Sequence, residues 1–192
     1  MKDRRIRKSQ EAIKAAVIEL MMDKSFDQIT IQDISDRADV SRRTVYLHYM
    51  DKFDLVDKLI EEHINRLREL CDIAGHDAEY TDMGLLWFEY LEKHHLFFSA
   101  MLASRGNSFF RNRFLDFFLQ ELKNMVKGKE IHERSITGLT EDDDVETQFV
   151  GAAIVGVVEW WFKNGKPHPP SLMAQRMGTL LERNLKADTP KA

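Results

Sequence analysis

Two adjacent arginines, Arg42 and Arg43, follow Ser41 directly and precede Tyr46 and His48 by one helical turn. Arginine carries a planar, permanently charged fork of donors that suits phosphate groups and the edge of guanine in the major groove. Tyrosine and histidine side chains can donate to phosphate oxygens. Because serine is a favoured helix cap, the arginines should stand in the first turn of a helix. The cluster predicts a surface that contacts DNA, although two arginines on a helix can also be an ordinary solvated pair.

Charge is unevenly distributed along the 192-residue chain, whose formal net charge is −4. Residues 1–50 hold ten Lys and Arg against eight Asp and Glu, a net +2, and the remainder holds eighteen against twenty-four, a net −6. Five of the first eight residues are Lys or Arg, so positive charge is concentrated in an N-terminal arm and at Arg42 and Arg43. A local basic face of this kind is compatible with a polyanionic partner although the whole chain is acidic.

The elements that must position this cluster are helices, because all four prolines lie at or beyond Pro167 and no strand-like alternation is sustained. Ile13, Val17 and Leu20 fall on one helical face and predict a first helix from Ser9 to Met22, preceded by the basic arm. Beyond the N-terminal region, helices are expected at about 82–95, 96–104, 106–127, 144–164 and 170–187. A break near residues 75–82 is a candidate module boundary.

Three polar residues are placed to begin further helices in the N-terminal region. Thr30 has Asp33 three residues later, which is the capping-box arrangement for a short second helix. Ser41 can cap a third short segment to about residue 49, and Asp51 can cap a longer fourth helix. Two short helices joined by about three residues form the helix-turn-helix layout, here at about residues 30–49.

The stretch from Phe26 to Leu59, FDQITIQDISDRADVSRRTVYLHYMDKFDLVDKL, resembles the N-terminal domain of TetR-family transcriptional regulators. In that family a threonine opens the second helix, an I-A-x-x-A-G-V-S core makes the turn, and Tyr-x-x-aromatic followed by Lys joins the third and fourth helices. The matching positions, within a resemblance that covers about residues 6–65, are Thr30, Ile34, Ala38, Val40, Ser41, Tyr46, Tyr49 and Lys52.

Two positions depart from the family pattern. Ser35 stands where the family usually has Ala, and Asp39 where it usually has Gly. Asp tolerates the left-handed backbone conformation better than most residues other than glycine, so we expect the turn to survive at a modest cost in strain.

The resemblance implies an all-α protein of about nine helices. It implies a three-helix, helix-turn-helix DNA-binding domain at residues 1–65 and a larger helical domain at 66–192 that binds an effector and dimerises. Which of the two arginines reads a base stays open. The residues expected to contact DNA are Thr30, Ser41, Arg42, Arg43, Thr44, Tyr46, Leu47, His48, Tyr49 and Lys52.

Specific binding normally needs two recognition helices about 34–36 Å apart, so a dimerisation surface is expected. TetR-like regulators usually dimerise through their last two long helices, which here correspond to residues 145–165 and 172–185. Three small residues in the first segment would allow close helix approach, and the second carries an apolar stripe. Alternatively, both segments complete the core of the monomer. The residues expected at the interface are Gly151, Ala152, Gly156, Met173, Met177, Leu180 and Leu181.

Ten aromatic residues lie between positions 87 and 118. Aromatic side chains dominate both cores and ligand pockets, and a stripe at helical spacing is more often core. The family resemblance implies an effector held inside this domain, for which a small apolar or aromatic molecule is the natural choice. The residues expected to line its site are Trp87, Tyr90, Phe98, Phe114, Phe118 and Trp160.

Several other functions find no support in the residue pattern. The single Cys71 cannot form an internal disulfide, which favours a reducing cytoplasm. The most apolar stretch is too short to span a membrane. His94 and His95 diverge by about 100° on a helix and would not chelate one metal, and the acidic run at 140–144 suits a helix cap better than a metal loop. No nucleophile, phosphate-loop or metalloprotease motif occurs, so no catalytic residue, metal or cofactor is expected.

The leading hypothesis is therefore a dimeric, cytoplasmic DNA-binding regulator, a repressor released from a palindromic operator by a small molecule. A second hypothesis is a TetR-like regulator or co-activator whose C-terminal domain binds a protein, because Trp160 to Pro167 looks like one branch of the family that includes co-activators. A third is an enzyme that uses the aromatic module as its active site.

Overall fold

The computed structural model describes residues 2–75, 79–103, 108–130 and 144–185. This part of the chain is helical and contains no strand, which confirms the predicted all-α class. Two non-α segments also occur, a 3-10 turn η1 at Phe26–Gln28 and a π-helical turn η2 at Ser99–Ala103. The nine α-helices of the described residues are α1 (Lys2–Asp23), α2 (Ile31–Arg37), α3 (Arg42–Tyr46), α4 (Lys52–Ala74), α5 (Tyr80–Lys93), α6 (His95–Phe98), α7 (Ser108–Glu130), α8 (Asp144–Lys163) and α9 (Pro170–Leu185).

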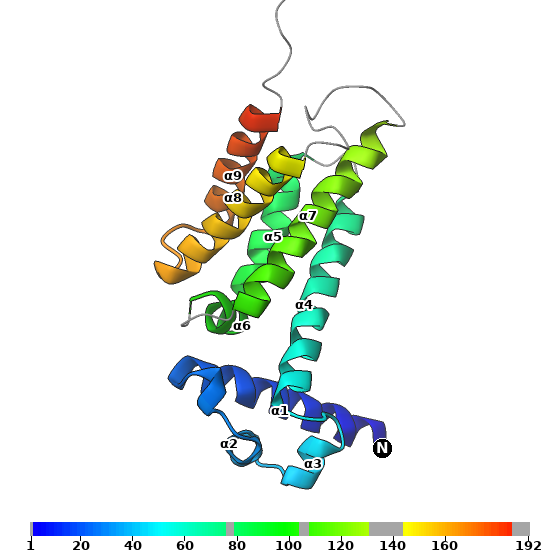
Figure 1. Cartoon of the computed structure of the whole chain (residues 1–192), viewed down its shortest axis with the longest axis vertical. Helices are drawn as coiled ribbons and strands as arrows, with labels where there is room; N and C mark the ends of the chain where they lie inside the picture. Colours follow the sequence, from blue (N-terminus) through cyan, green and yellow to red (C-terminus); the bar gives the residue numbers. More distant parts are fainter. Residues whose placement is uncertain (1, 76–78, 104–107, 131–143, 186–192) are drawn as a thin grey trace, which may run out of the picture. The chain divides into compact units, whose positions relative to one another are not determined.

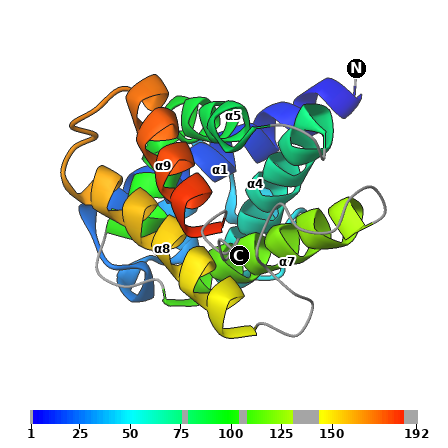
Figure 2. The same ribbon diagram turned by 90° about the horizontal axis from the view of Figure 1, so that it is seen from above.

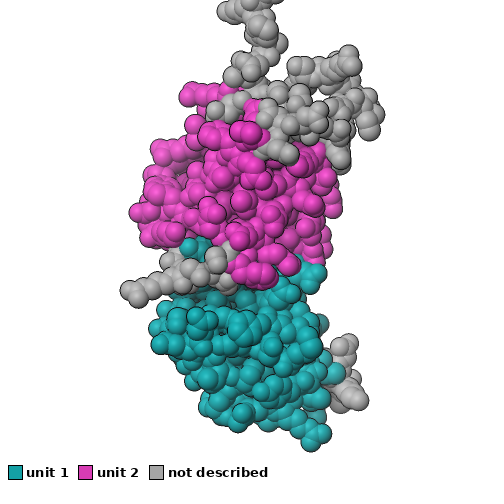
Figure 3. All heavy atoms as spheres, in the orientation of Figure 1, with its two compact units in different colours: residues 1–63, 96–107 teal, residues 64–95, 108–192 magenta. Residues whose placement is uncertain are grey.

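The helices form two compact units (Figure 3). Unit 1 comprises residues 1–63 with 96–107, and unit 2 comprises residues 64–95 with 108–192. Helix α4 therefore contributes its residues up to His63 to unit 1 and the rest to unit 2. The short α6–η2 segment lies apart from α1–α4 in the sequence, yet it belongs to unit 1, where the His63 ring stacks on Phe97 at 3.9 Å between centroids.

The core of unit 1 is built from one apolar face of each helix. Helix α1 packs against α2 and η2, and α2 packs against α3 (Figure 1). Ile13, Val17, Ile34, Val45 and Ile60 are fully buried there, so the spacing of apolar residues in α1 points inward as predicted.

Helix α1 begins earlier than the apolar pattern predicts. We expect a basic arm before a helix that starts at Ser9, but the structure continues the helix back to Lys2. Residues 4–8 are exposed on it. Their charged side chains have no apolar periodicity to reveal a helix, although Arg and Lys are good helix formers. The positive charge of the N-terminus is thus carried on a helix.

Polar caps begin the helices at the positions that the sequence indicates. The Asp33 N–H donates to Thr30 Oγ1 at 3.1 Å, and the Thr30 N–H donates to Asp33 Oδ2 at 2.8 Å, which completes the capping box of α2. Ser41 Oγ accepts from the Thr44 N–H at 3.1 Å at the start of α3. Asp51 Oδ1 accepts from two main-chain N–H groups in the first turn of α4, each at 2.8 Å. All three predicted caps are confirmed.

The turn between α2 and α3 accommodates both departures from the family pattern. Asp39 adopts the left-handed conformation with φ 51°, where glycine is usual. Ser35 is buried, and its hydroxyl donates to the Gln32 carbonyl at 3.0 Å, so the extra oxygen is satisfied within α2. The Val40 N–H donates to the Ser35 carbonyl at 3.0 Å and closes the turn.

Unit 2 is a bundle in which α5 packs on α9 and α7 packs on α8. Figures 1 and 2 show α8 and α9 side by side. Glycines allow some of these helices to approach closely: a Cβ on Gly151 of α8 would meet the Leu119 side chain of α7 at 2.7 Å. Five aromatic residues of α5 and α7 are buried in this bundle. We call them the aromatic cluster and define it as Trp87 of α5 with Phe110, Phe114, Phe117 and Phe118 of α7.

Candidate nucleic-acid interface

Helix α3 presents two different faces. Val45 and Tyr49 point into the core of unit 1, with Tyr49 only 3% exposed. Tyr46 and Leu47 are 53% and 71% exposed, and Arg42 and Arg43 are exposed as well. The exposure of Arg42, Arg43, Tyr46 and Leu47 agrees with the surface expected from the sequence, whereas the burial of Tyr49 does not. Within the described part of the chain neither arginine forms an ion pair, which leaves both guanidinium groups available to an external anion.

Three hydroxyl side chains near this face already have partners in the protein. Ser41 Oγ and Thr44 Oγ1 lie 2.8 Å apart, and Thr30 Oγ1 donates to Asp33 Oδ2 at 2.7 Å. These hydroxyls shape the ends of α2 and α3, and a phosphate would share or displace their present bonds. His48 is half-buried, and its ring lies edge-on to Tyr49 at 6.2 Å.

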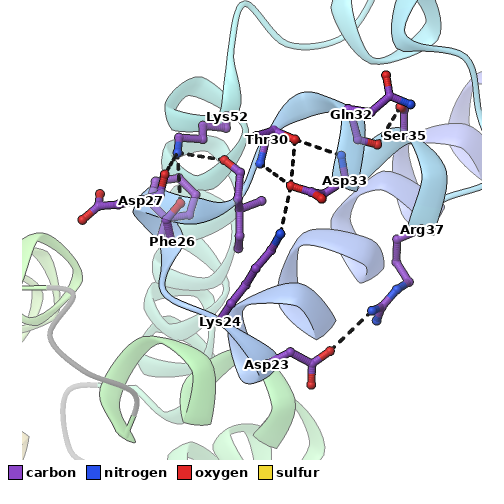
Figure 4. Close-up of polar contacts among 11 residues, drawn as sticks. Asp23, Lys24, Phe26, Asp27, Thr30, Gln32, Asp33, Ser35, Arg37 and Lys52 are labelled. Atoms are coloured by element: carbon purple, nitrogen blue, oxygen red, sulfur yellow. Dashed lines mark hydrogen bonds and ion pairs between the residues drawn. The ribbon is translucent and has the colours of Figure 1, made fainter.

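Two residues expected to contact DNA occupy other roles. The Tyr49 hydroxyl is buried and has no hydrogen-bond partner among the described residues, and burial raises its pKa to about 12. A side chain in the core cannot reach a phosphate. Lys52 Nζ donates to three main-chain carbonyls, those of Phe26, Asp27 and Ile29 (Figure 4). An ammonium group has three N–H donors, so all are engaged inside the protein. We therefore do not include Tyr49 and Lys52 in the candidate DNA-binding surface.

Ion pairs between the end of α1 and α2 fix the second helix, and no sequence pattern predicts them. Lys24 Nζ lies 2.9 Å from Asp33 Oδ2. Arg37 contacts Asp23 at 3.4 Å (Figure 4) and Glu19 at 3.1 Å, and these two bonds raise the pKa of its guanidinium. The pKa of Asp33 is lowered to about 2, first by the Thr30 hydroxyl and then by Lys24. The partners lie on different elements, so no local spacing signals them.

The aromatic residues expected to line an effector site do not come together as one set. Trp87, Phe114 and Phe118 belong to the aromatic cluster, with Trp87–Phe118 and Phe114–Phe118 centroids 4.9 and 4.8 Å apart. Phe98, in contrast, belongs to unit 1, and Trp160 is 46% exposed on α8. Tyr90 is half-buried, with its ring 4.4 Å from that of His94. Of the six residues expected to line an effector site, three therefore lie together, in the aromatic cluster.

Polar side chains border the aromatic cluster, again from helices distant in sequence. Cys71 of α4 is buried, which raises the pKa of its thiol to about 12, and the charge of Glu121 adds to the rise. The indole N–H of Trp87 faces that thiol and offsets part of the rise, without making a regular hydrogen bond. Arg68 lies 3.9 Å from Glu121 and over the ring of Phe117. The aromatic cluster therefore has polar side chains at its border.

Of the residues expected at a dimer interface, some are buried inside unit 2 and others are exposed on its surface. Gly151 faces Leu119 of its own chain, and Met173 and Met177 are buried in unit 2, so single-chain packing accounts for these three. Leu181 is half-buried, whereas Leu180 is exposed on α9. Four exposed apolar or small residues of α8 and one half-buried glycine lie at helical spacing. They form what we call the α8 stripe, namely Val145, Phe149, Ala152 and Trp160, which are exposed, with half-buried Gly156.

The described residues lack the features of two other classes of site. No three His, Cys, Asp or Glu side chains of that part of the chain gather where they could hold a metal ion. None of its helices combines the length and apolar character that crossing a bilayer requires.

Two family models match the chain. The model described as "Bacterial regulatory proteins, tetR family" matches residues 13–59, which include α2 and α3. The model described as "Transcriptional regulator C-terminal region" matches residues 78–183. The matches cover the helix-turn-helix and most of unit 2.

Three curated relatives are similar over most of this chain. The HTH-type transcriptional regulator YxbF of Bacillus subtilis is 23% identical over 183 residues, which are 94% of this chain but only 46% of the relative. The IcaR negative regulator of the biofilm operon icaADBC in Staphylococcus epidermidis is 22% identical and covered to 78%, with 76% of this chain aligned. The dhaKLM operon activator DhaS of Lactococcus lactis is 24% identical and covered to 71%, with 74% of this chain aligned.

The fold is also found in solved structures. The fatty acid regulator FadR of Bacillus subtilis, solved with stearoyl-CoA, superposes with a TM-score of 0.73 over 91% of this chain and 98% of its own, at 18% identity. At that identity the likeness shows the fold alone. The two family models settle the identity: the chain belongs to the TetR family of transcriptional regulators and carries that family's DNA-binding domain.

Proposed function

We propose that this regulator binds a palindromic operator as a homodimer, represses transcription in the cytoplasm, and releases the operator when a small apolar or aromatic molecule binds unit 2. The outward face of α3 carries the proposal. Its two arginines are exposed, make no ion pair among the described residues, and stand on a helix whose other face is anchored in the core. Regulators of the TetR family bind DNA and act as dimers.

Within the proposed surface each side chain has a role that its chemistry allows. Arg42 and Arg43 contact guanine edges or phosphates, and Tyr46 and His48 donate to phosphates and set the register. Leu47, which is 71% exposed, offers an apolar surface to a thymine methyl group. Thr30, Ser41 and Thr44 lie at the helix starts, where their hydroxyls and nearby main-chain N–H groups meet the sugar-phosphate backbone.

The α8 stripe together with Leu180 is the proposed dimer surface. Phe149 is 61% exposed, and it shares one helical face with an exposed tryptophan and with small residues. Association of two copies would remove this apolar area from water. Among the residues that the structure describes, nothing lies within 4 Å of a Cβ placed on Gly156, so a second helix could approach this glycine. A twofold pair of such faces is self-complementary, as a closed dimer requires.

The aromatic cluster and its polar border are the proposed effector site. Aromatic rings supply apolar contacts, and the Trp87 N–H, which lacks an acceptor in the described structure, would donate to an effector oxygen. The neighbouring FadR structure holds stearoyl-CoA, and the relative IcaR is a negative regulator, which together support a ligand-released repressor. Tyr90, beside the cluster on α5, is a further candidate contact.

A second candidate function is a regulator whose unit 2 binds a protein instead of a small molecule. Phe114 and Phe118 are fully buried and contact each other, so in this conformation their rings are already covered. The relative DhaS is an activator, which is compatible with this alternative. Under it, the surface of unit 2, including Trp160, would be the recognised feature.

The deciding experiment is binding of the purified protein to the DNA upstream of its own gene, measured by fluorescence anisotropy against an unrelated duplex at several salt concentrations. We expect selective binding to the upstream DNA, and we expect the logarithm of the binding constant to fall linearly with the logarithm of the salt concentration. The variant Arg42→Ala/Arg43→Ala should lose selective binding while its circular dichroism and dimerisation stay unchanged. The matched control is Arg176→Ala/Arg183→Ala, which removes the same charge from α9 of unit 2, outside the helix-turn-helix, and should bind normally.

Two outcomes would contradict the proposal. Equal affinity for the upstream and unrelated duplexes would argue against an operator there and favour a regulator that needs a protein partner. Retained selectivity in the Arg42/Arg43 double variant would show that another face reads DNA. Once the operator is identified, apolar and aromatic compounds can be tested for their ability to release the protein from it. This test separates the two candidate functions, because only a repressor that binds a small molecule should dissociate from the operator.

A further inference from the structure

The ammonium group of Lys52 is enclosed by main-chain oxygens (Figure 4) and by two aromatic rings. Its Nζ donates to the carbonyls of Phe26 at 3.0 Å, Asp27 at 2.9 Å and Ile29 at 2.8 Å. The same nitrogen lies 4.9 Å from the centroid of the Phe26 ring and 5.3 Å from that of Phe53. Cations are attracted to aromatic faces at such distances. The donors of this lysine are therefore satisfied within the protein.

The three carbonyls belong to one place in the chain, the short turn η1 and the residue after it. Ile29 follows η1 directly and precedes Thr30, the cap of α2. Lys52 is the first residue of α4. The bonds from its side chain therefore join the two ends of the segment 29–52, which contains the whole helix-turn-helix. A tie at this point limits how α2 and α3 can move against the start of α4.

We propose that Lys52 is a positioning residue that holds the helix-turn-helix against the start of α4, and that it does not contact a DNA phosphate. This inference rests on the proposed function, because the position that it controls is that of the DNA-reading face. A phosphate contact would require the ammonium group to leave three carbonyls, and these would then need other donors. The side chain acts on DNA binding through the backbone of η1 and the entry to α2.

The test compares Lys52→Met with Lys58→Met in the full-length protein. Lys58 lies on the same helix, is half exposed and pairs with Asp54. Its Nζ also donates to the His48 carbonyl, at 3.4 Å, and lies 5.5 Å from the centroid of the Tyr49 ring, but it makes one main-chain bond where Lys52 makes three. The Lys58 variant therefore loses the same charge without opening the η1 turn. We expect Lys52→Met to lower the denaturant midpoint clearly more than Lys58→Met does. In operator binding, we expect Lys52→Met to have a lower affinity than the wild type at every salt concentration. The slope of log affinity against log salt concentration should be the same for the two proteins.

A phosphate contact would give a different plot. Loss of one phosphate contact reduces the salt slope by about 0.9, whereas loss of positioning lowers affinity at every salt concentration alike. A Lys52→Met slope reduced by that amount, with a denaturant midpoint equal to that of Lys58→Met, would overturn the proposal. Failure of the wild-type protein to bind any operator would instead refute the proposed function, and the denaturation result would still decide the role of Lys52.

A second measurement covers the case in which Lys52→Met does not fold. Reductive methylation of the wild-type protein, mapped by mass spectrometry, reports how readily each amine leaves its bonds. We expect Lys52 to react more slowly than Lys58 in the free protein and to show the same rate when operator DNA is added. A Lys52 that reacts as fast as Lys58 and becomes protected only by DNA would identify it as a phosphate contact.

Discussion

At the residue scale, the turn of the helix-turn-helix depends on Asp39, whose φ of 51° lies in the left-handed region. This conformation costs an L-residue roughly 1–2 kcal/mol, and Asp bears it better than Ala because its short polar side chain can bond locally. We expect Asp39→Gly to raise the free energy of unfolding by about 0.5 kcal/mol and Asp39→Ala to lower it by about 1 kcal/mol. Urea unfolding of the three proteins measures both. Equal stability of the Gly and Ala variants would show that the backbone relaxes at this position.

Another residue-scale effect is a dependence of stability on pH through Asp33. Its pKa is lowered in the folded state from 3.8 to about 2 by the Thr30 hydroxyl and by Lys24. A group with a lowered folded-state pKa contributes stability above its unfolded pKa and loses that contribution as pH falls toward the folded value. The contribution of Asp33 should therefore be complete above pH 4 and should disappear between about pH 4 and pH 2.

The variant Asp33→Asn checks this prediction. It should melt at a lower temperature than the wild type at neutral pH, because it loses the ion pair with Lys24 and part of the capping box. Between pH 4 and pH 2 its melting temperature should fall less than that of the wild type. Thermal melts followed by circular dichroism across this range provide the comparison. Parallel falls in the two proteins would assign the acid sensitivity to other carboxylates.

At the scale of the elements, the contact between α5 and α9 depends on two glycines that differ in the space around them. A Cβ on Gly178 would overlap Thr81 Oγ1 and would lie 3.0 Å from Thr81 N and Cα, so the first turn of α5 or the facing part of α9 would have to shift. A Cβ on Gly84 would meet Ala174 Cα at 3.5 Å, an ordinary contact. We expect Gly178→Ala to lower the free energy of unfolding by roughly 1–3 kcal/mol and Gly84→Ala to raise it by up to about 1 kcal/mol. Urea denaturation distinguishes the two.

Gly84→Ala is the control for Gly178→Ala, because both glycines lie at the contact between α5 and α9 and both variants add one methyl group. If Gly178→Ala proves as stable as the wild type, α9 must be able to move away from α5 by several tenths of an ångström without penalty. That result would contradict a close-packed contact between these helices.

Helices and caps are predictable from the sequence because their signals are local. Thr30 with Asp33 is a pattern over three residues, and the inward side of α3 follows from its apolar spacing. Contacts between helices carry no such signal. The bonds from Lys52 to η1 cross more than twenty positions, and a lysine beside a recognition helix resembles a phosphate contact until its partners are seen. The sequence groups Phe98 with the other aromatics because spacing cannot show that its segment belongs to unit 1.

At the scale of the whole molecule, the proposed dimer can be tested at one aromatic residue of the α8 stripe. Phe149→Asp places a charge at the centre of the apolar face, so we expect sedimentation velocity to show a monomer at concentrations where the wild type is dimeric. Phe109→Asp is the matched control, because Phe109 is also an exposed phenylalanine but lies on α7. The control should remain dimeric. A dimeric Phe149→Asp protein would place the interface on another surface.

Gly156 provides an independent test of the same surface. No described residue of its own chain lies within 4 Å of the position that a Cβ would occupy there, so Gly156→Leu should leave the fold of the single chain unchanged. The larger side chain should nevertheless keep a second α8 from approaching and should weaken the dimer. If Gly156→Leu dimerises as the wild type does, close approach at this glycine is not part of the interface.

If the α8 stripe is the dimer surface, the placement of the tryptophans makes the intrinsic fluorescence of the protein a measure of dimerisation. Trp87 and Trp161 are buried, and the Trp161 N–H donates to the His168 carbonyl at 2.8 Å, whereas Trp160 is 46% exposed on the α8 stripe. Iodide in solution should quench the fluorescence of Trp160 far more than that of the other two indoles. Dilution that separates the protomers would therefore raise the quenchable fraction of the emission, and Trp160→Phe would abolish that change. Subunit exchange could then be followed in real time without attaching a dye.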